Sequence, residues 1–334
     1  MTYTTKPQIE ITSRKATACP SVLLEGLSLV SPADHSKTPS LTKSPRSDSS
    51  KSSDESTEQH DIYSDTSHSD GEDHIEIDGN ERILKERFPT STSMERKRFL
   101  TGRPLEKASR KMSSYMQWRK LYKLDDASYL QRKAEIKSDG DAWDFAVEQT
   151  FKCYEDRPKS TPCKLPRVIK FGEVDDIHAL DGRRVGYVLP GRIDRKLASL
   201  DFYARCLGVF LDLKLDRESS ETIYIVVDVR SGLNWPNLSP TKLLSFVKSL
   251  NKQLINAMPE RMHQTIVFPI PLIAKPVWGL FKNILDKKIT AKISVLWGKA
   301  DTSSPVPKGL PTDVFDDRVI ESLESIRRSE FIYL

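Results

Sequence analysis

Residues 258–297 read MPERMHQTIVFPIPLIAKPVWGLFKNILDKKITAKISVLW, and three patterns follow one another in this segment. Residues 265–270 have the composition of a short strand. Residues 272–286 repeat apolar side chains at helical spacing, and residues 292–297 return to a strand pattern. A strand, a helix and a second strand predict a βαβ unit with parallel strands.

The same alternation extends towards the N-terminus. Residues 185–189 and the β-branched run 223–229 indicate strands, while residues 199–213 and 241–257 indicate helices. Strands that alternate with helices predict an α/β fold with a mainly parallel sheet. We therefore expect residues 161–334 to form one domain around this sheet.

The preceding part of the chain is expected to be helical. Residues 94–122 have helical spacing, with a break at 101–104, where Pro104 suits the first turn of a new helix. A further helix is expected around residues 142–154. Residues 81–160 are therefore predicted to be a small N-terminal helical subdomain.

Residues 1–80 differ from the rest in composition. They contain 7 Lys+Arg and 14 Asp+Glu, whereas residues 81–334 contain 45 and 33, so an acidic tail precedes a basic body. The tail is rich in serine and poor in aromatic residues, which predicts disorder. Its Ser-Pro and Thr-Pro steps and the acid-flanked serines between 64 and 73 suggest a phosphoprotein, although a solvated tail with chance sites is the alternative.

Composition also bears on localisation. The four cysteines form no C-x-x-C pair, which favours a reducing compartment. The N-terminus lacks the apolar core of a signal peptide, and no segment approaches the ~20 apolar residues that span a bilayer. We expect a cytoplasmic, monomeric protein, whose basic body binds an anionic membrane surface peripherally.

The helix expected at 272–286 has an apolar face bordered by lysines. The face and its edge consist of Ile273, Val277, Trp278, Leu280, Phe281, Ile284 and Leu285. Lys275 and Lys282 lie just beyond it, which is how interfacial helices meet a headgroup layer. This pattern predicts a movable lid with membrane contact through both lysines. An amphipathic helix packed permanently on the sheet explains the same periodicity.

Glu260 and Lys292 flank this helix in the sequence. A carboxylate and an ammonium beside a hydrophobic lid suggest a polar site next to an apolar one, as the binding of a lipid requires. A buried ion pair that stabilises the sheet is the alternative.

Six short motifs occur in order between residues 94 and 300. They are RFLTGR at 98–103, WR at 118–119, DGR at 181–183, VD at 227–228, MPERM at 258–262 and FKNILD at 281–286. Their order resembles the CRAL-TRIO lipid-binding family, most closely its phosphatidylinositol-transfer branch. The resemblance does not extend to the tail.

This resemblance implies a sheet that floors an apolar pocket, a gating helix at 272–286 and a small helical subdomain. It further implies that Arg103, Glu260 and Lys292 bind the headgroup of phosphatidylinositol, and the interval of 32 residues between the last two matches that branch. A bound phospholipid is then the expected ligand, with no other cofactor, no metal and no catalytic residue.

Two departures bear on the choice of lipid. Members that also carry phosphatidylcholine have a serine and a threonine where this chain has Ile223 and Ile225. These two residues are expected to line the pocket without the hydroxyls that would meet a phosphocholine phosphate. The comparison predicts weak or absent phosphatidylcholine binding.

Other functions were weighed against this one. The chain has no G-x-x-x-x-G-K-[ST], G-x-S-x-G or H-E-x-x-H motif, which argues against the common enzyme classes. Its lysines are not clustered with aromatic residues, which argues against nucleic-acid binding. A lipid-sensing adaptor that has lost transfer, a carrier of a sterol- or tocopherol-like ligand, and a lipid kinase or other effector as partner remain alternatives.

Overall fold

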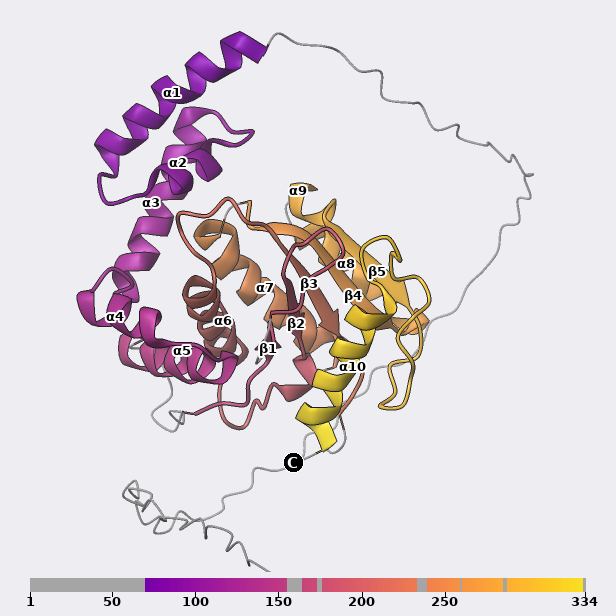
Figure 1. Ribbon diagram of the computed structural model, residues 1–334. Helices are drawn as coiled ribbons and strands as arrows, with labels where there is room; N and C mark the ends of the chain where they lie inside the picture. The colour runs from indigo at the N-terminus through magenta and orange to yellow at the C-terminus, as the bar shows by residue number, and fades with distance from the viewer. Residues whose placement is uncertain are drawn as a thin grey trace, which may run out of the picture. The chain divides into compact units, whose positions relative to one another are not determined.

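The computed structural model describes most of the chain beyond the acidic tail (Figure 1). The described residues are 70–154, 164–172, 176–232, 239–258, 260–284 and 287–332. The chain divides into two units, Met1–Asp65 and Thr66–Leu334, and every described residue belongs to the second. Disorder was predicted for residues 1–80. Residues 1–69 and all but the end of the expected phosphorylation region lie outside the described part, and residues 70–80 are helical.

Five α-helices precede the sheet within the described residues. They are α1 (Asp70–Arg87), α2 (Ser93–Leu100), α3 (Leu105–Leu121), α4 (Ala127–Glu135) and α5 (Asp139–Cys153). The predicted helices at 94–122 and 142–154 are present, including the break before Pro104. Helix α1 begins at Asp70, before residue 81, where the helical subdomain was expected to start, and α4 was not predicted.

Five strands form one sheet in the order β1-β2-β3-β4-β5. They are β1 (Ile169–Lys170), β2 (Val185–Val188), β3 (Ile223–Asp228), β4 (Met262–Ile270) and β5 (Ile293–Trp297). Strand β1 is antiparallel to β2, and all other pairs are parallel. The expected α/β fold with a mainly parallel sheet is confirmed, and β1 is an edge strand that the sequence did not reveal.

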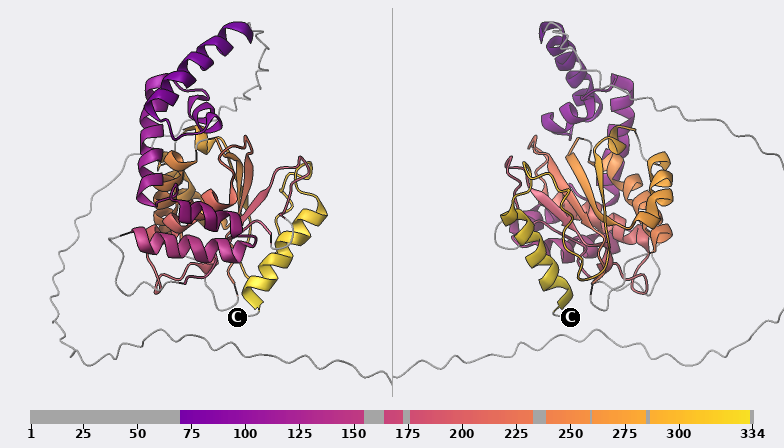
Figure 2. Two further views of the ribbon diagram at one scale, coloured as in Figure 1. Left: turned by 60° about the vertical axis from the view of Figure 1, so that its left-hand side comes forward. Right: turned by 90° about the vertical axis from the view of Figure 1, so that its right-hand side faces the viewer.

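The connections between the parallel strands determine where the helices lie. Helix α6 (Leu200–Lys214) connects β2 to β3, α7 (Pro240–Ala257) connects β3 to β4, and α8 (Lys275–Ile284) lies between β4 and β5. Crossovers of this kind are right-handed, so neighbouring strands taken in sequence order place their helices on one face. Figure 2 shows α7 and α8 on one face of the sheet and the C-terminal helix α10 (Asp317–Ile332) on the other.

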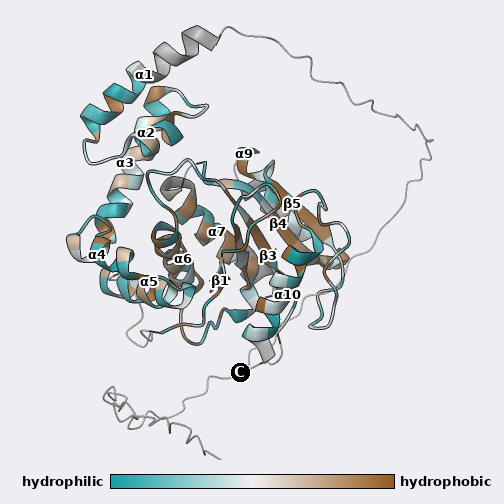
Figure 3. Ribbon diagram, in the orientation of Figure 1, coloured by the Kyte–Doolittle hydropathy of each residue, from teal (hydrophilic) through white to brown (hydrophobic). Residues whose placement is uncertain are grey.

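Alternate side chains of β3 face the two layers. Tyr224 and Val226 belong to the core cluster that contains Val319 and Leu323 of α10. Ile223 belongs to a larger cluster that joins the sheet to α6 and to the N-terminal helices. Strongly hydrophobic residues accordingly concentrate along the central strands (Figure 3).

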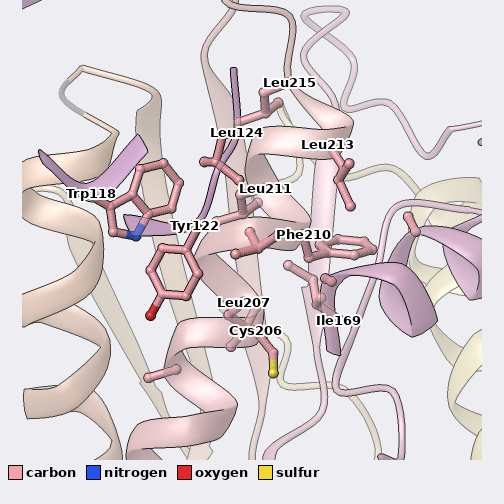
Figure 4. Packing of buried hydrophobic residues seen from close by; sticks show 14 of the residues in the cluster. Trp118, Tyr122, Leu124, Ile169, Cys206, Leu207, Phe210, Leu211, Leu213 and Leu215 are labelled. Carbon is pink, nitrogen blue, oxygen red and sulfur yellow. The ribbon is translucent and has the colours of Figure 1, made fainter. Parts of the chain in front are cut away.

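The larger cluster runs across the expected boundary between the helical subdomain and the sheet domain. Trp118 of α3 and Tyr122, directly after this helix, pack near Leu207, Phe210 and neighbouring residues of α6 (Figure 4). Tyr122 and Phe210 are fully buried. The N-terminal helices therefore share a hydrophobic core with the α/β part, and α3 is held close to the helices that cover the sheet.

Helix α10 is connected to the sheet by a buried charge network at the end of β3. The fully buried Asp228 accepts hydrogen bonds from Tyr187 Oη at 2.6 Å and from Arg230 Nη2 at 2.7 Å. Arg230 also pairs with Glu324 of α10 at 2.5 Å. Arg327, one turn further along α10, lies 3.8 Å from Asp228. Asp228, at the end of β3, is thus a structural residue that holds α10 on the face of the sheet opposite α7 and α8.

The end of α10 is anchored separately to the edge strand. Glu330 pairs with Lys170 of β1 at 2.5 Å and with Arg192 at 2.5 Å. Burial raises the pKa of Glu330, but the hydrogen bond from Lys170 and the nearby cations outweigh it and hold that pKa below its ordinary value. This carboxylate therefore stays charged and keeps the C-terminal helix attached.

The helix predicted at 272–286 is divided, so its prediction as one continuous helix is wrong. Residues 272–274 form a 3-10 turn (η2, Leu272–Ala274), α8 follows, and a short helix α9 (Lys287–Thr290) precedes β5. The physical reason is Pro276, which has no N–H to donate and whose ring crowds the carbonyl of the residue four positions earlier. An α-helix can therefore begin at Lys275 but cannot extend regularly back to Leu272. None of the described helices combines the length and apolarity needed to cross a bilayer.

Candidate functional site

A cavity of about 800 Å³ lies between the sheet and the helices on its crossover face. Its floor includes Ile225 and Val227 of β3, and its walls include Leu211 of α6, Phe246 of α7 and Trp278 of α8. These side chains are apolar, so the interior offers few partners for a polar ligand and a favourable environment for hydrocarbon.

The structure places some of the predicted pocket residues at the cavity, while other predicted residues lie outside the described part. Ile223, Ile225 and Trp278 line the cavity. The other residues predicted to line the pocket from this segment have side chains that lie outside the described part. They are Val277, Leu280, Phe281, Ile284 and Leu285.

Ile273 does not belong to the lid face, which corrects its prediction as a pocket or gate residue. It lies in the 3-10 turn, where the α-helical spacing that placed it beside residue 277 does not apply. Its side chain is 89% exposed, and the neighbouring Leu272 is 63% exposed. The two residues form an exposed apolar pair immediately before α8.

Three charged residues meet at one end of the cavity. Glu260 precedes β4 and Lys292 precedes β5, and the amino ends of parallel strands lie at the same edge of a sheet. Arg103 Nη2 donates to Glu260 Oε1 at 2.7 Å, and Lys292 Nζ donates to Glu260 Oε2 at 3.3 Å. All three residues line the cavity. The structure therefore brings the predicted headgroup residues together, and the Glu260–Lys292 ion pair is part of the same arrangement.

Backbone carbonyl groups hold both cations of this arrangement, Arg103 and Lys292. Arg103 follows α2, and its Nη1 donates to the carbonyls of Arg98 at 3.2 Å and Phe99 at 3.4 Å in the last turn of that helix. Lys292 Nζ also donates to the carbonyl of Met262 at 2.9 Å. These contacts restrict the orientation of both cations before any ligand binds.

Glu260 has a left-handed backbone, with φ at +55°. This conformation is uncommon for a residue with a Cβ atom and costs roughly 1–3 kcal/mol. Such strain persists where the surroundings hold it, and it clusters at functional sites. Here the two cations hold the carboxylate that the strained turn presents.

The carboxylate remains ionised in this setting. Burial raises the pKa of Glu260, but the ammonium of Lys292 and the hydrogen bonds from Lys292 and Arg103 outweigh that effect and place its pKa below the ordinary value. Arg103, Glu260 and Lys292 together carry one positive charge in excess. The site can therefore receive one negative charge, while the carboxylate can accept hydrogen bonds from hydroxyl groups.

Two further arginines of the sequence motifs have structural contacts. Arg98 donates to the carbonyls of Arg217 at 2.9 Å and Ser219 at 2.5 Å. Arg261 donates to the carbonyls of Asp216 and Glu221, the latter at 2.9 Å. Burial, with the nearby Arg98, lowers the pKa of Arg261 to about 10. Both arginines hold the loop between α6 and β3.

Three lysines at the cavity were missed by the sequence reasoning. Lys107 and Lys111 of α3 and Lys288 of α9 line it together with the predicted residues. Lys288 Nζ also donates to the carbonyl of Gly102 at 3.2 Å. The four-residue spacing of Lys107 and Lys111 was visible as a signal that they share one helix face. What the spacing does not show is that this face borders the cavity.

The two lysines predicted to contact a membrane lie over aromatic rings. Lys275 Nζ is 5.7 Å from the centre of the Trp297 ring, and Lys282 Nζ is 5.9 Å from that of Trp278. Such cation–π contacts hold an ammonium against a ring face without removing it from solvent. Membrane contact by these lysines stays a prediction.

The comparison with known families addresses the region that builds the floor and the lid. Residues 179–308 match the family model of the CRAL/TRIO domain. The CRAL/TRIO match contains β2 to β5 together with Glu260 and Lys292, whereas Arg103 lies outside it. CRAL/TRIO domains bind lipids, so the match supports lipid binding as the general function.

Solved structures with similarity to this chain include that of Sfh5. The crystal structure of Sfh5 is 18% identical in sequence, with a TM-score of 0.35, and the similarity covers 67% of this chain and 81% of that chain. No curated protein matches the chain.

The described ranges also bear on metal binding and on thiol chemistry. No group of three or more His, Cys, Asp or Glu side chains there is placed to hold a metal ion. Cys206 is buried, and burial raises the pKa of its thiol to about 12, so this cysteine is a packing residue and not a nucleophile.

Proposed function

We propose that this protein binds an inositol phospholipid and transfers it between membranes. The supporting observation is that Arg103, Glu260 and Lys292 meet at one end of an apolar cavity of about 800 Å³. The acyl chains would occupy the cavity, and the headgroup would replace some of the contacts within the trio. The phosphodiester carries one negative charge, which matches the excess positive charge of the three residues.

A carrier can load and unload a lipid only if the free energy of the lipid is nearly the same in the membrane and in the protein. Burial of acyl chains in the cavity is favourable relative to water at ~25 cal/mol per Å² of apolar area. The chains are already dry in a bilayer, so that gain largely cancels when a lipid moves between membrane and protein. Headgroup contacts then decide which lipid is carried, and each charge-assisted hydrogen bond contributes roughly 1.5–3 kcal/mol.

The lid of this cavity would be α8, which packs against α7 and contributes Trp278 to the lining. Leu272 and Ile273 expose apolar surface immediately before it, and Lys275 and Lys282 add positive charge along it. Exposed apolar residues beside lysines suit contact with an anionic membrane surface. We infer that the protein docks there peripherally and opens α8 at the membrane.

Native mass spectrometry of the protein purified from eukaryotic cells tests the identity of the cargo. Co-purification of an inositol phospholipid, with phosphatidylcholine absent because Ile223 and Ile225 supply no hydroxyls, is the expected result. A co-purified molecule with the mass of a sterol would contradict the assignment of an inositol phospholipid as the cargo. An empty cavity would favour an adaptor that has kept the fold without transfer.

The double variant Trp278→Ala with Lys282→Glu is expected to bind vesicles containing phosphatidylserine at least about thirtyfold more weakly. Each basic residue near an anionic surface contributes about 1 kcal/mol, and reversal of one charge changes that attraction twice over. Co-sedimentation with vesicles measures the effect.

A control variant changes an exposed apolar residue and an adjacent lysine elsewhere on the molecule. Leu121 is 50% exposed at the end of α3, and Lys120 precedes it, so Leu121→Ala with Lys120→Glu changes one apolar residue and one charge away from α8. If the two double variants bind vesicles equally well, the membrane face lies elsewhere on the molecule.

A further inference from the structure

The floor of the cavity carries one hydroxyl group among apolar side chains. Among the described strand residues that line the cavity, only Thr265 of β4 has an oxygen or nitrogen atom in its side chain. Its partners in the sheet register are Ile225 of β3 and Ile293 of β5, which line the cavity as well. Thr265 therefore presents a polar atom within a row of hydrocarbon.

A β-bulge at the start of β4 turns the Thr265 side chain towards the cavity. His263 is the extra residue, because the pairing with β3 passes from Met262 directly to Gln264. An extra residue of this kind shifts the alternation of side chains by one position. Met262 and Thr265, three residues apart, therefore both line the cavity, whereas regular alternation from Met262 would place Gln264 there.

The hydroxyl group of Thr265 has a weak partner within the protein. Thr265 is 9% exposed, and its Oγ1 lies 2.8 Å from Met262 Sδ. A thioether sulfur is a weak acceptor. The other two hydroxyl groups among the described lining residues, on Thr101 and Ser231, bond to oxygen atoms at 3.0 and 3.1 Å. A ligand that brings an oxygen atom to Thr265 would thus offer it a stronger acceptor than it has now.

Thr265 lies between the charged residues and the hydrocarbon part of the cavity. Its backbone N–H donates to the carbonyl of Lys292 at 2.8 Å, so it is the strand neighbour of the residues directly behind the headgroup site. Glu260 precedes it along β4, and Val267 follows it on the cavity floor. A lipid whose headgroup contacts Glu260 and Lys292 would pass Thr265 where its chains begin.

A glycerophospholipid carries its polar groups in a fixed order. The phosphodiester is followed by glycerol, then by the two ester groups, and then by hydrocarbon. With the phosphodiester at Arg103 and Lys292, the ester carbonyls are the next polar atoms to enter the cavity. A carbonyl oxygen that leaves water without gaining a donor raises the free energy of the bound state. The Thr265 hydroxyl can supply that donor.

We propose that Thr265 Oγ1 donates a hydrogen bond to an ester carbonyl of the bound phospholipid and so selects lipids with acyl chains over lipids with alkyl ether chains. This inference rests on the proposed function and adds to it the linkage between glycerol and chain. Thr265 acts as a binding residue, and no covalent bond is made or broken.

The test offers the full-length protein two forms of phosphatidylinositol at once. Vesicles of phosphatidylcholine contain equal amounts of the diester form and of a diether analogue with the same chains, which lacks both carbonyl oxygens. Native mass spectrometry of the recovered protein measures how much of each lipid is bound, because the two differ in mass. Wild type is expected to load about fivefold more of the ester form, and Thr265→Val is expected to load the two nearly equally.

Two control variants separate the hydroxyl from its surroundings. Thr265→Ser keeps the hydroxyl and should keep the preference for the ester form. Thr222→Val makes the same chemical change directly before β3, at a position that does not line the cavity, and should also keep it. Thr265→Val should be at least as stable to urea as wild type, because it removes a polar atom from apolar surroundings.

Each outcome decides for or against the contact. Equal loading of the two lipids by wild type, or an ester preference that survives in folded Thr265→Val, would overturn the proposed hydrogen bond and leave the proposed function standing. An equal loss of both lipids in Thr265→Val would place the hydroxyl at the phosphodiester and overturn the assignment to the ester. Loading of neither lipid by wild type would overturn the proposed function itself.

Discussion

Replacement of Lys292 by alanine is expected to abolish measurable transfer of phosphatidylinositol between vesicles. The ammonium is one of two cations that hold Glu260, and it would donate to the headgroup phosphate. Loss of a charge-assisted hydrogen bond of 1.5–3 kcal/mol weakens binding by roughly 10- to 150-fold. A fluorescence transfer assay with purified protein measures the change.

The fold should survive this substitution. The Lys292 side chain is 36% exposed, and Arg103 remains paired with Glu260 at 2.7 Å when the lysine is removed. The free energy of unfolding should therefore fall by about 1 kcal/mol or less. Lys299→Ala, at an exposed position that does not line the cavity, is the matched control and should transfer normally.

A folded Lys292→Ala protein that transfers at the wild-type rate would assign Lys292 to the ion pair alone. Lys292→Arg is a second test of whether the charge at this position binds the phosphate, because the variant keeps the charge but changes the shape of the donor. This variant should retain part of the activity if the charge binds the phosphate.

The second large effect is expected on stability. Arg230→Met should lower the free energy of unfolding by about 3–5 kcal/mol, because it leaves the fully buried Asp228 without its main partner. The substitution also removes the pair between Arg230 and Glu324, which connects α10 to the end of β3. Urea unfolding followed by circular dichroism measures the difference.

Two comparisons show whether the buried charge is the cause. Asp228→Leu with Arg230→Met removes both charges and should recover part of the lost stability. Arg318→Met breaks the ion pair with Asp316 on the surface of α10, where the arginine is 88% exposed, and should change stability by about 0–1 kcal/mol. If Arg230→Met is as stable as Arg318→Met, the network at Asp228 does not hold α10 on the sheet.

The periodicity of the sequence predicted the main strands and their crossover helices because each has one dominant pattern. Strand β3 is a continuous β-branched run, and α6 and α7 have long helical repeats. The meeting of Glu260 and Lys292 was predicted from their positions around the helix and from the family resemblance, and the parallel pairing of β4 and β5 explains it. Arg103 required the family motif, because nothing in its local pattern indicates a partner 157 residues away.

Other features depended on packing that local patterns do not contain. Helix α10 has apolar residues at Val319, Leu323 and Ile326, a helical signal that was present and not used. The division of the lid helix follows from Pro276, whose effect on the preceding turn was underestimated. The approach of Lys288 to Gly102 depends on the path of the chain from α8 to β5, which only the assembled structure shows.

The placement of all three crossovers on one face has a consequence for how cargo enters. The base of the cavity is a ladder of backbone hydrogen bonds between parallel strands, and its far side is closed by α10. The cavity is covered by α8, which packs against α7. Displacement of α8 would therefore disturb packing between helices, while every strand pair stays intact. For the proposed lipid carrier, exchange of lipid and loss of the fold would for this reason be separate events with separate barriers.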